Sequence, residues 1–87
     1  MIIDVHAHLC DPAFDLDLEA VLARASSAGV GSVVAVGETL ADARKNLALA
    51  EKHPVIRPAA GLYPTHLDPN EADAMIRGHY REGWKIV

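Results

Sequence analysis

The chain has 87 residues, of which 51% are hydrophobic and 23% are charged, and its formal net charge at pH 7 is −4. This composition is typical of a folded domain, but the chain is too short for a complete eight-unit α/β barrel, which needs roughly 200 residues or more. The negative charge excludes a broad basic surface for non-specific binding of nucleic acid or anionic lipid, although a metal site that handles one phosphodiester needs no such surface.

The cysteine content and the lengths of the apolar runs predict the cellular location of the protein. Cys10 is the single cysteine, so no internal disulfide can form, which favours a reducing environment. The amino terminus has no basic region followed by a long apolar stretch, so we expect no export signal. No apolar run approaches the ~18 residues of a membrane span. We therefore expect a cytoplasmic protein with no membrane partner.

Four apolar runs predict strands. Residues 2–8 are short and β-branched, and residues 32–36 form a continuous apolar run, as in a strand that is covered on both faces. Residues 55–60 predict a third strand, which Pro58 weakens because proline has no ladder donor. Residues 84–87 look like the beginning of a fourth strand.

Amphipathic stretches between these runs predict helices. The first begins at Asp15 or Asp17, which are suited to capping, and ends at Gly29. The second begins at Thr39, with Asp42 three residues later as a weaker form of the capping box.

Proline and glycine mark the remaining boundaries. Pro54 ends the second helix, and residues 61–66 form a loop after the third strand. A third, weaker helix runs from Asn70 toward His79, and we expect Gly78 to interrupt it. The alternation of strands and helices predicts about three βα units in a parallel sheet with right-handed crossovers.

His6 and His8 are the strongest chemical signal in the chain. They lie one residue apart at the carboxyl end of the first strand, so their side chains point to the same face. Parallel α/β sheets bind ligands at that end of their strands. Two imidazoles about 7 Å apart along a strand can bind one divalent ion if twist or another ligand closes the site.

Five short motifs follow one another in a characteristic order. They are Asp4-Val5-His6-Ala7-His8, Phe14-Asp15, Ala28-Gly29-Val30, Val36-Gly37 and Gly61-Leu62-Tyr63-Pro64. In this order they resemble the amino-terminal third of the TatD family of metal-dependent hydrolases. The resemblance covers essentially the whole chain and implies a partial TIM (β/α)8 barrel, with residues 1–87 as the amino-terminal fragment of one domain. It also implies that the full-length protein is a deoxyribonuclease with DNA as substrate and one or two divalent ions, Mg²⁺, Mn²⁺ or Zn²⁺, as cofactors.

The resemblance assigns roles to few individual residues. His6 and His8 match the first-strand metal ligands of the family, whose site also uses a Glu, two further His and an Asp. That Glu follows the strand beginning at residues 84–87, so we expect it beyond Val87 and expect the fragment alone to be inactive. Tyr63 stands where members often have His, which puts any substrate or phosphate contact assigned to that position in doubt.

The proposed chemistry follows from the metal. A divalent ion lowers the pKa of bound water and polarises a phosphoryl oxygen, and two ions can hold both the attacking and the leaving oxygen. Asp4 has the same strand parity as the two histidines. It either orients one imidazole or makes a hydrogen bond at the strand end.

Three other polar side chains are candidates near the same end of the sheet. Glu38 follows the second strand and is a possible third ligand, but an acidic residue at a helix start more often complements the helix dipole. His66 lies in a loop, where substrate contact is less frequent than an ordinary solvated position. Arg57 is one cation among scattered charges, which favours a surface role over phosphate binding.

Four further residues are expected to have structural roles. His53 and His79 lie at or in helices and are expected to be solvated or to complement the dipole. Cys10 is expected to be a small packing residue, because the sequence shows no base to activate it as a nucleophile. Trp84 is expected to pack in the core.

Two other functions remain open from the sequence. The same barrel and metal could act on a cyclic amide or another ester, as in wider amidohydrolase relatives. Alternatively, the chain is a non-catalytic, truncated product, with no stable protein partner other than copies of itself bound through open sheet edges.

Overall fold

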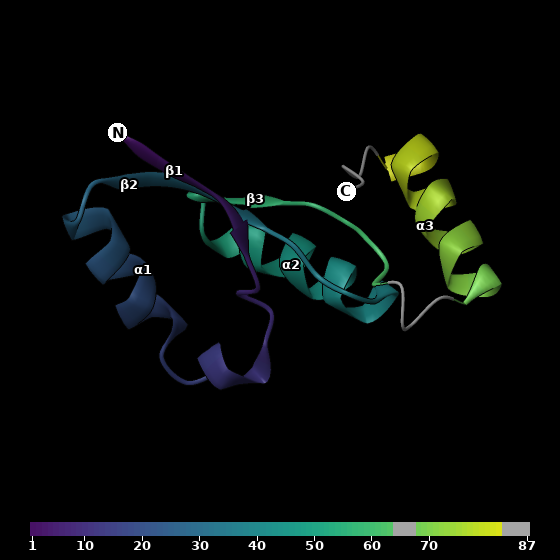
Figure 1. Ribbon diagram of the computed structural model, residues 1–87, viewed down its shortest axis with the longest axis horizontal. Coiled ribbons are helices and arrows are strands. Elements are labelled where there is room, and N and C mark those ends of the chain that lie inside the picture. Colours follow the sequence, from purple (N-terminus) through teal and green to yellow (C-terminus); the bar gives the residue numbers. More distant parts are fainter. Residues whose placement is uncertain (64–67, 83–87) are drawn as a thin grey trace.

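The computed structural model describes residues 1–63 and 68–82. Their elements are β1 (Ile2–Ala7), a short 3₁₀ helix (Pro12–Phe14), α1 (Leu18–Ser27), β2 (Val30–Ala35), α2 (Leu40–Lys52), β3 (Ile56–Pro58) and α3 (Pro69–Glu82). The three strands form one parallel sheet in the order β1-β2-β3 (Figure 1). The predicted parallel α/β arrangement is therefore confirmed. The expected fourth strand, Trp84 and His66 lie outside the described residues.

The strands differ from the prediction at their ends. β1 stops at Ala7, so His8 lies in the loop after the strand, and the β1–β2 register is irregular between Asp4 and Ala7. β2 starts at Val30, earlier than expected. β3 ends at Pro58, which has no N–H to donate, although the next amide, that of Ala59, still bonds to the Ala35 carbonyl at 2.9 Å.

The first helix begins without the predicted cap. Asp17 holds the N-cap position of α1, but its side chain makes no capping hydrogen bond, and Asp15 instead accepts a 2.6 Å bond from Lys45. A short 3₁₀ helix that the sequence analysis missed precedes it, capped by Asp11. Gly29 ends the helix with φ +98°, a backbone conformation that favours glycine, as predicted.

The sequence predicts the N-cap of α2 correctly and the N-cap of α3 incorrectly. Thr39 caps α2 by accepting a 3.2 Å bond from the Asp42 amide. At α3 the capping side chain is that of Asp68, whose carboxylate accepts a 2.8 Å hydrogen bond from the Asn70 amide. Asn70 is therefore not the cap. Gly78 does not interrupt α3, because one glycine costs only about 1 kcal/mol in a helix that packs against α2.

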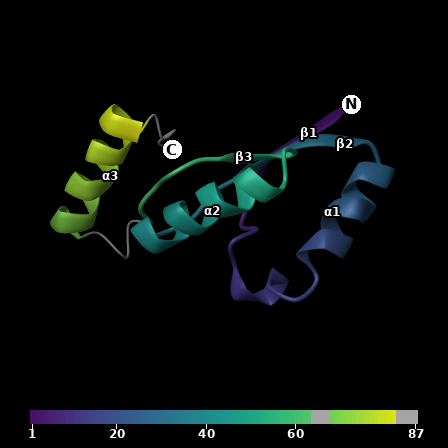
Figure 2. The same cartoon turned by 180° about the vertical axis from the view of Figure 1, so that it is seen from behind.

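Two apolar clusters hold these elements together. The larger one packs the sheet against α1 and α2, and its buried members are Leu9, Leu18, Val33, Ala35 and Ile56. The smaller one joins α2 to α3, which lies beyond the amino-terminal end of α2 and away from the strands (Figure 2). Its buried members are Ala43, Ala60 and Met75.

β1 is an edge strand of the described sheet, and its apolar side chains are exposed. Ile2, Ile3 and Val5 are 55%, 52% and 70% exposed. An exposed apolar edge strand is prone to pair with another chain, so self-association stays a prediction. No described helix is long and apolar enough to cross a membrane.

Candidate metal centre

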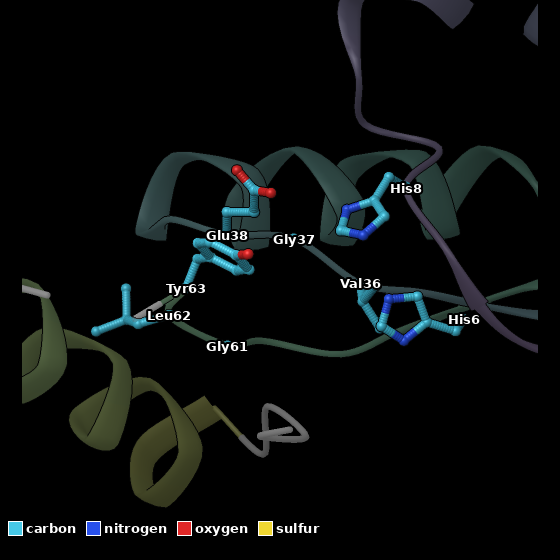
Figure 3. Close-up of a pocket in the computed structure, with 8 residues that line it drawn as sticks. All are labelled: His6, His8, Val36, Gly37, Glu38, Gly61, Leu62 and Tyr63. Atoms are coloured by element: carbon cyan, nitrogen blue, oxygen red, sulfur yellow. The ribbon is translucent and has the colours of Figure 1, made fainter. Parts of the chain in front are cut away.

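His6 and His8 lie together at the carboxyl end of β1. Their ring centroids are 5.2 Å apart, and the ring planes meet at 68° (Figure 3). Both residues are exposed, so solvent reaches them. The two rings are close together as expected, even though His8 lies just after the end of the strand. Their role as metal ligands stays a prediction.

The two imidazoles line a pocket of about 150 Å³. Its other walls come from the segments that follow the next two strands (Figure 3). These residues are Val36, Gly37 and Glu38 after β2, and Gly61, Leu62 and Tyr63 after β3. The carboxyl ends of all three strands therefore meet at one pocket, as expected for ligand binding in a parallel α/β sheet.

Hydrogen bonds made by backbone groups, one of them to a carboxylate, fix the segment that bears the histidines. The Asp4 carboxylate accepts a 3.0 Å bond from the His6 amide, so it stabilises the strand end, one of the two roles considered for it. The Val36 amide donates to the Ala7 carbonyl at 2.9 Å, which joins this segment to the end of β2. The Asp11 amide donates to the His8 carbonyl at 3.0 Å and closes the following turn.

Cys10 lies in the same turn and joins it to the end of β2. Its side chain is 4% exposed, and its thiol lies 3.7 Å from the Val36 carbonyl as a weak donor. Burial raises the pKa of the Cys10 thiol, and the negative charge of Asp42 raises it further. A buried thiol with a raised pKa is a poor nucleophile, so the expected packing role is supported.

Asn46 is a buried polar residue that the sequence analysis missed. It is fully buried beneath β2, and its Nδ2 donates to the Ala35 carbonyl at 3.4 Å. Its Oδ1 has no hydrogen-bond partner among the described residues. A signal was present, because residue 46 lies three positions after Ala43 and shares its helix face.

Glu38 lines the pocket, and backbone hydrogen bonds hold it in place. Its amide donates to the Asp42 carboxylate at 2.9 Å, and its carbonyl accepts a 2.9 Å bond from the Tyr63 amide. Within residues 1–63 and 68–82, no three His, Cys, Asp or Glu side chains come close enough to hold one metal ion. The structure therefore does not bring Glu38 to the histidines as a third ligand.

The remaining candidates lie away from this pocket. Arg57 is exposed on β3, and His79 is exposed on α3. His53 is half-buried at the C-cap of α2. Their positions agree with the structural roles expected for them.

Comparison with known proteins places this geometry in a family. Residues 3–85 match the family described as TatD related DNase. The chain belongs to the TatD-related DNase family.

Curated relatives of this TatD-family chain have names that refer to hydrolysis. It is 39% identical over 66 residues to "Uncharacterized metal-dependent hydrolase YjjV" of Escherichia coli K12, covering 76% of this chain and 26% of that protein. It is 37% identical over 71 residues to human "Deoxyribonuclease TATDN3", covering 80% and 26%. It is 36% identical over 61 residues to "3'-5' ssDNA/RNA exonuclease TatD" of Enterobacter lignolyticus, covering 70% and 24%. The chain thus spans about a quarter of the length of these relatives.

The fold is also that of a solved TatD homolog. The crystal structure of YjjV from E. coli superposes with a TM-score of 0.86 at 31% identity, over 99% of this chain and 34% of that one. This likeness confirms the predicted fold class, a parallel α/β arrangement that is part of a TIM-type barrel.

Proposed function

We propose that the protein containing these residues is a metal-dependent deoxyribonuclease of the TatD type. The observation that supports this most directly is the pair of imidazoles, 5.2 Å apart, at a pocket where the carboxyl ends of three parallel strands meet. The names of two relatives, a deoxyribonuclease and an ssDNA/RNA exonuclease, support DNA as the substrate. Because the chain spans about a quarter of those relatives, we further propose that residues 1–87 are the amino-terminal part of one barrel domain.

The donor set at the pocket fits part of a divalent metal site. His6 and His8 would hold the ion, because both rings are solvent-accessible and imidazole nitrogen is a common ligand of divalent transition metals. We propose one or two ions, from among Mg²⁺, Mn²⁺ and Zn²⁺. When bound, such an ion makes hydroxide available near neutral pH and polarises a phosphoryl oxygen.

The chain's own residues set the charge and the geometry of this site. Neutral imidazoles leave the positive charge of an ion uncompensated, which preserves its strength as a Lewis acid. Asp4 holds the backbone of His6, and the turn after His8 is closed by the Asp11 amide, so both rings start from fixed backbone positions. Two imidazoles fill only half of a tetrahedral site, so we propose that residues 1–87 alone do not hydrolyse DNA.

The test compares histidine variants of the protein made from its complete reading frame. Hydrolysis of an end-labelled oligonucleotide and bound metal are measured for wild type, His6→Ala and His8→Ala. We expect each variant to lose more than about a hundredfold in rate and to retain less metal, since even outer-shell changes cost 10- to 100-fold. His79→Gln is the matched control, because His79 is exposed on α3 and does not line the pocket.

Three results would contradict the proposal. Unchanged hydrolysis and metal content in both histidine variants would remove the metal role. Activity on cyclic amides or carboxylic esters but not on oligonucleotides would favour the amidohydrolase alternative. Hydrolysis by residues 1–87 alone would refute the proposed incompleteness of the site.

A cytoplasmic location stays a prediction, supported by the single thiol, Cys10.

A further inference from the structure

Tyr63 presents an aromatic ring to the pocket that contains the two histidines. Its side chain is 50% exposed, and the residue lines the same pocket as His6 and His8. Among the large hydrophobic side chains that are exposed in the described part of the chain, it is the one aromatic residue. The others are Met1, Ile2, Ile3, Val5, Leu16 and Ile76.

The backbone under this ring is held in place. The Tyr63 amide donates a 2.9 Å hydrogen bond to the Glu38 carbonyl, which joins the segment after β3 to the segment after β2. The preceding residue, Leu62, packs against the small apolar cluster that includes Ala60 and Met75. The backbone position from which the ring extends is therefore fixed at the pocket edge, although the ring itself is half exposed.

The ring and the imidazoles lie on different sides of the pocket. In Figure 3, Tyr63 and the Glu38 side chain occupy one side, and His6 and His8 occupy the other. The pocket volume of about 150 Å³ is comparable with an apolar cavity that accepts one benzene-sized ring. A flat group can therefore lie beside Tyr63 while the group attached to it reaches the histidines.

A nucleobase is the flat group that suits this arrangement. Every base has a π-face, so stacking on an aromatic side chain tolerates sequence and changes affinity by roughly 5- to 150-fold per base. The described lining contains no Lys or Arg, so neither of these side chains is present on the Tyr63 side of the pocket to attract a phosphate. Aromatic stacking is then the interaction that this wall offers to a nucleotide.

We propose that Tyr63 stacks on one base of the DNA substrate, next to the phosphodiester that lies at His6 and His8. This inference rests on the proposed deoxyribonuclease function and adds a binding determinant to it. Tyr63 acts on affinity and leaves the reacting atoms untouched. Its loss therefore raises KM for substrates that have the base and has little effect on kcat.

The experiment pairs a change in the protein with a change in the substrate. Short single-stranded oligonucleotides, each lacking one base at a different position, are compared with the intact oligonucleotide for the protein made from its complete reading frame. For wild type, we expect one abasic position to lower kcat/KM by about tenfold, mainly through KM. For Tyr63→Ala, we expect the same abasic position to matter less than about twofold, because the stacking partner is already gone.

Two further variants separate stacking from a structural role. Tyr63→Phe keeps the ring and should discriminate between the two substrates as wild type does. Leu16→Ala removes another exposed apolar side chain that does not line the pocket, and it should also behave as wild type. A purely structural role of Tyr63 would lower kcat/KM equally for intact and abasic oligonucleotides.

The possible results distinguish this inference from the function on which it rests. If wild type hydrolyses every oligonucleotide equally well, or if Tyr63→Ala discriminates as wild type does, stacking by Tyr63 is wrong while the nuclease proposal stands. If Tyr63→Phe loses discrimination, the ring is not the recognising group. If wild type hydrolyses none of the oligonucleotides, both proposals fail.

Discussion

Asn46 tests the packing of α2 against the sheet, because it is a fully buried amide whose Oδ1 has no hydrogen-bond partner among the described residues. Asn46→Asp preserves the shape of the side chain but replaces the donor to the Ala35 carbonyl with an oxygen that ionises. Ala35 keeps its 2.9 Å bond from the Ala59 amide, so the sheet itself is not disrupted. The substitution therefore buries a carboxyl group next to the Cys10 thiol, which is only a weak donor.

The size of the effect follows from linkage between ionisation and folding. Burial raises the pKa of such a carboxyl by about three units, from about 3.9 in the unfolded chain to about 7 in the folded one. The loss of stability is therefore small below the unfolded-state pKa, grows as the pH rises, and levels off above the folded-state pKa. At about 1.36 kcal/mol per unit, we expect a loss of about 1.5 kcal/mol at pH 5 and about 4 kcal/mol at pH 8.

Urea denaturation at the two pH values measures this loss. Comparing the variant with wild type at the same pH cancels the contributions of the other titrating groups. Asn46→Leu is the control, because losing one long hydrogen bond and losing an unsatisfied oxygen offset each other to within about 1 kcal/mol at either pH. A loss in Asn46→Asp that is equal at both pH values, or no loss, would show that the side chain reaches water and would refute the reasoning.

Three further substitutions or treatments test other parts of the structure. Thr39→Ala removes the cap of α2 and should lower the free energy of unfolding by about 1 kcal/mol; an unchanged urea midpoint would contradict the role of its hydroxyl. Gly37→Ala places a Cβ against the Asp42 side chain, so we expect the free energy of unfolding to fall by about 1–3 kcal/mol and hydrolysis to weaken. An unaffected variant would mean that the segment after β2 can move away from Asp42. Cys10 should resist a thiol reagent such as DTNB in the native protein near pH 8 and react once urea unfolds it, because burial raises its pKa; rapid native labelling would show that the turn opens.

Periodicity and local chemistry were enough to predict most of the elements. Alternating apolar runs and amphipathic stretches identified three strands and three helices, and Gly29 and Thr39 marked boundaries that the structure confirms. These signals are local, since a cap or a C-terminal glycine acts on backbone groups within a few residues. The pairing of His6 with His8 was predictable for the same reason, because the two side chains are close in sequence.

Local signals failed where contacts between distant segments competed with a local preference. Asp17 stands at the correct N-cap position without making a capping bond, and Asp15 bonds to Lys45, thirty residues away in the chain. Gly78 was expected to break a helix, but packing of α3 against α2 outweighs the modest cost of one glycine. Such choices are set by which surfaces meet, so intrinsic preference alone does not decide them.

The sequence by itself determined the order of the elements, the parallel α/β class and the histidine pair at one strand end. Only the tertiary structure decided that Glu38 and Tyr63 share a pocket with that pair, that Asn46 is the buried polar residue beneath β2, and that Cys10 anchors the turn. The physical reason is separation along the chain. Bonds such as Tyr63 to Glu38 and Cys10 to Val36 join segments that are distant in the sequence, so they depend on the tertiary fold that brings the ends of the three strands together.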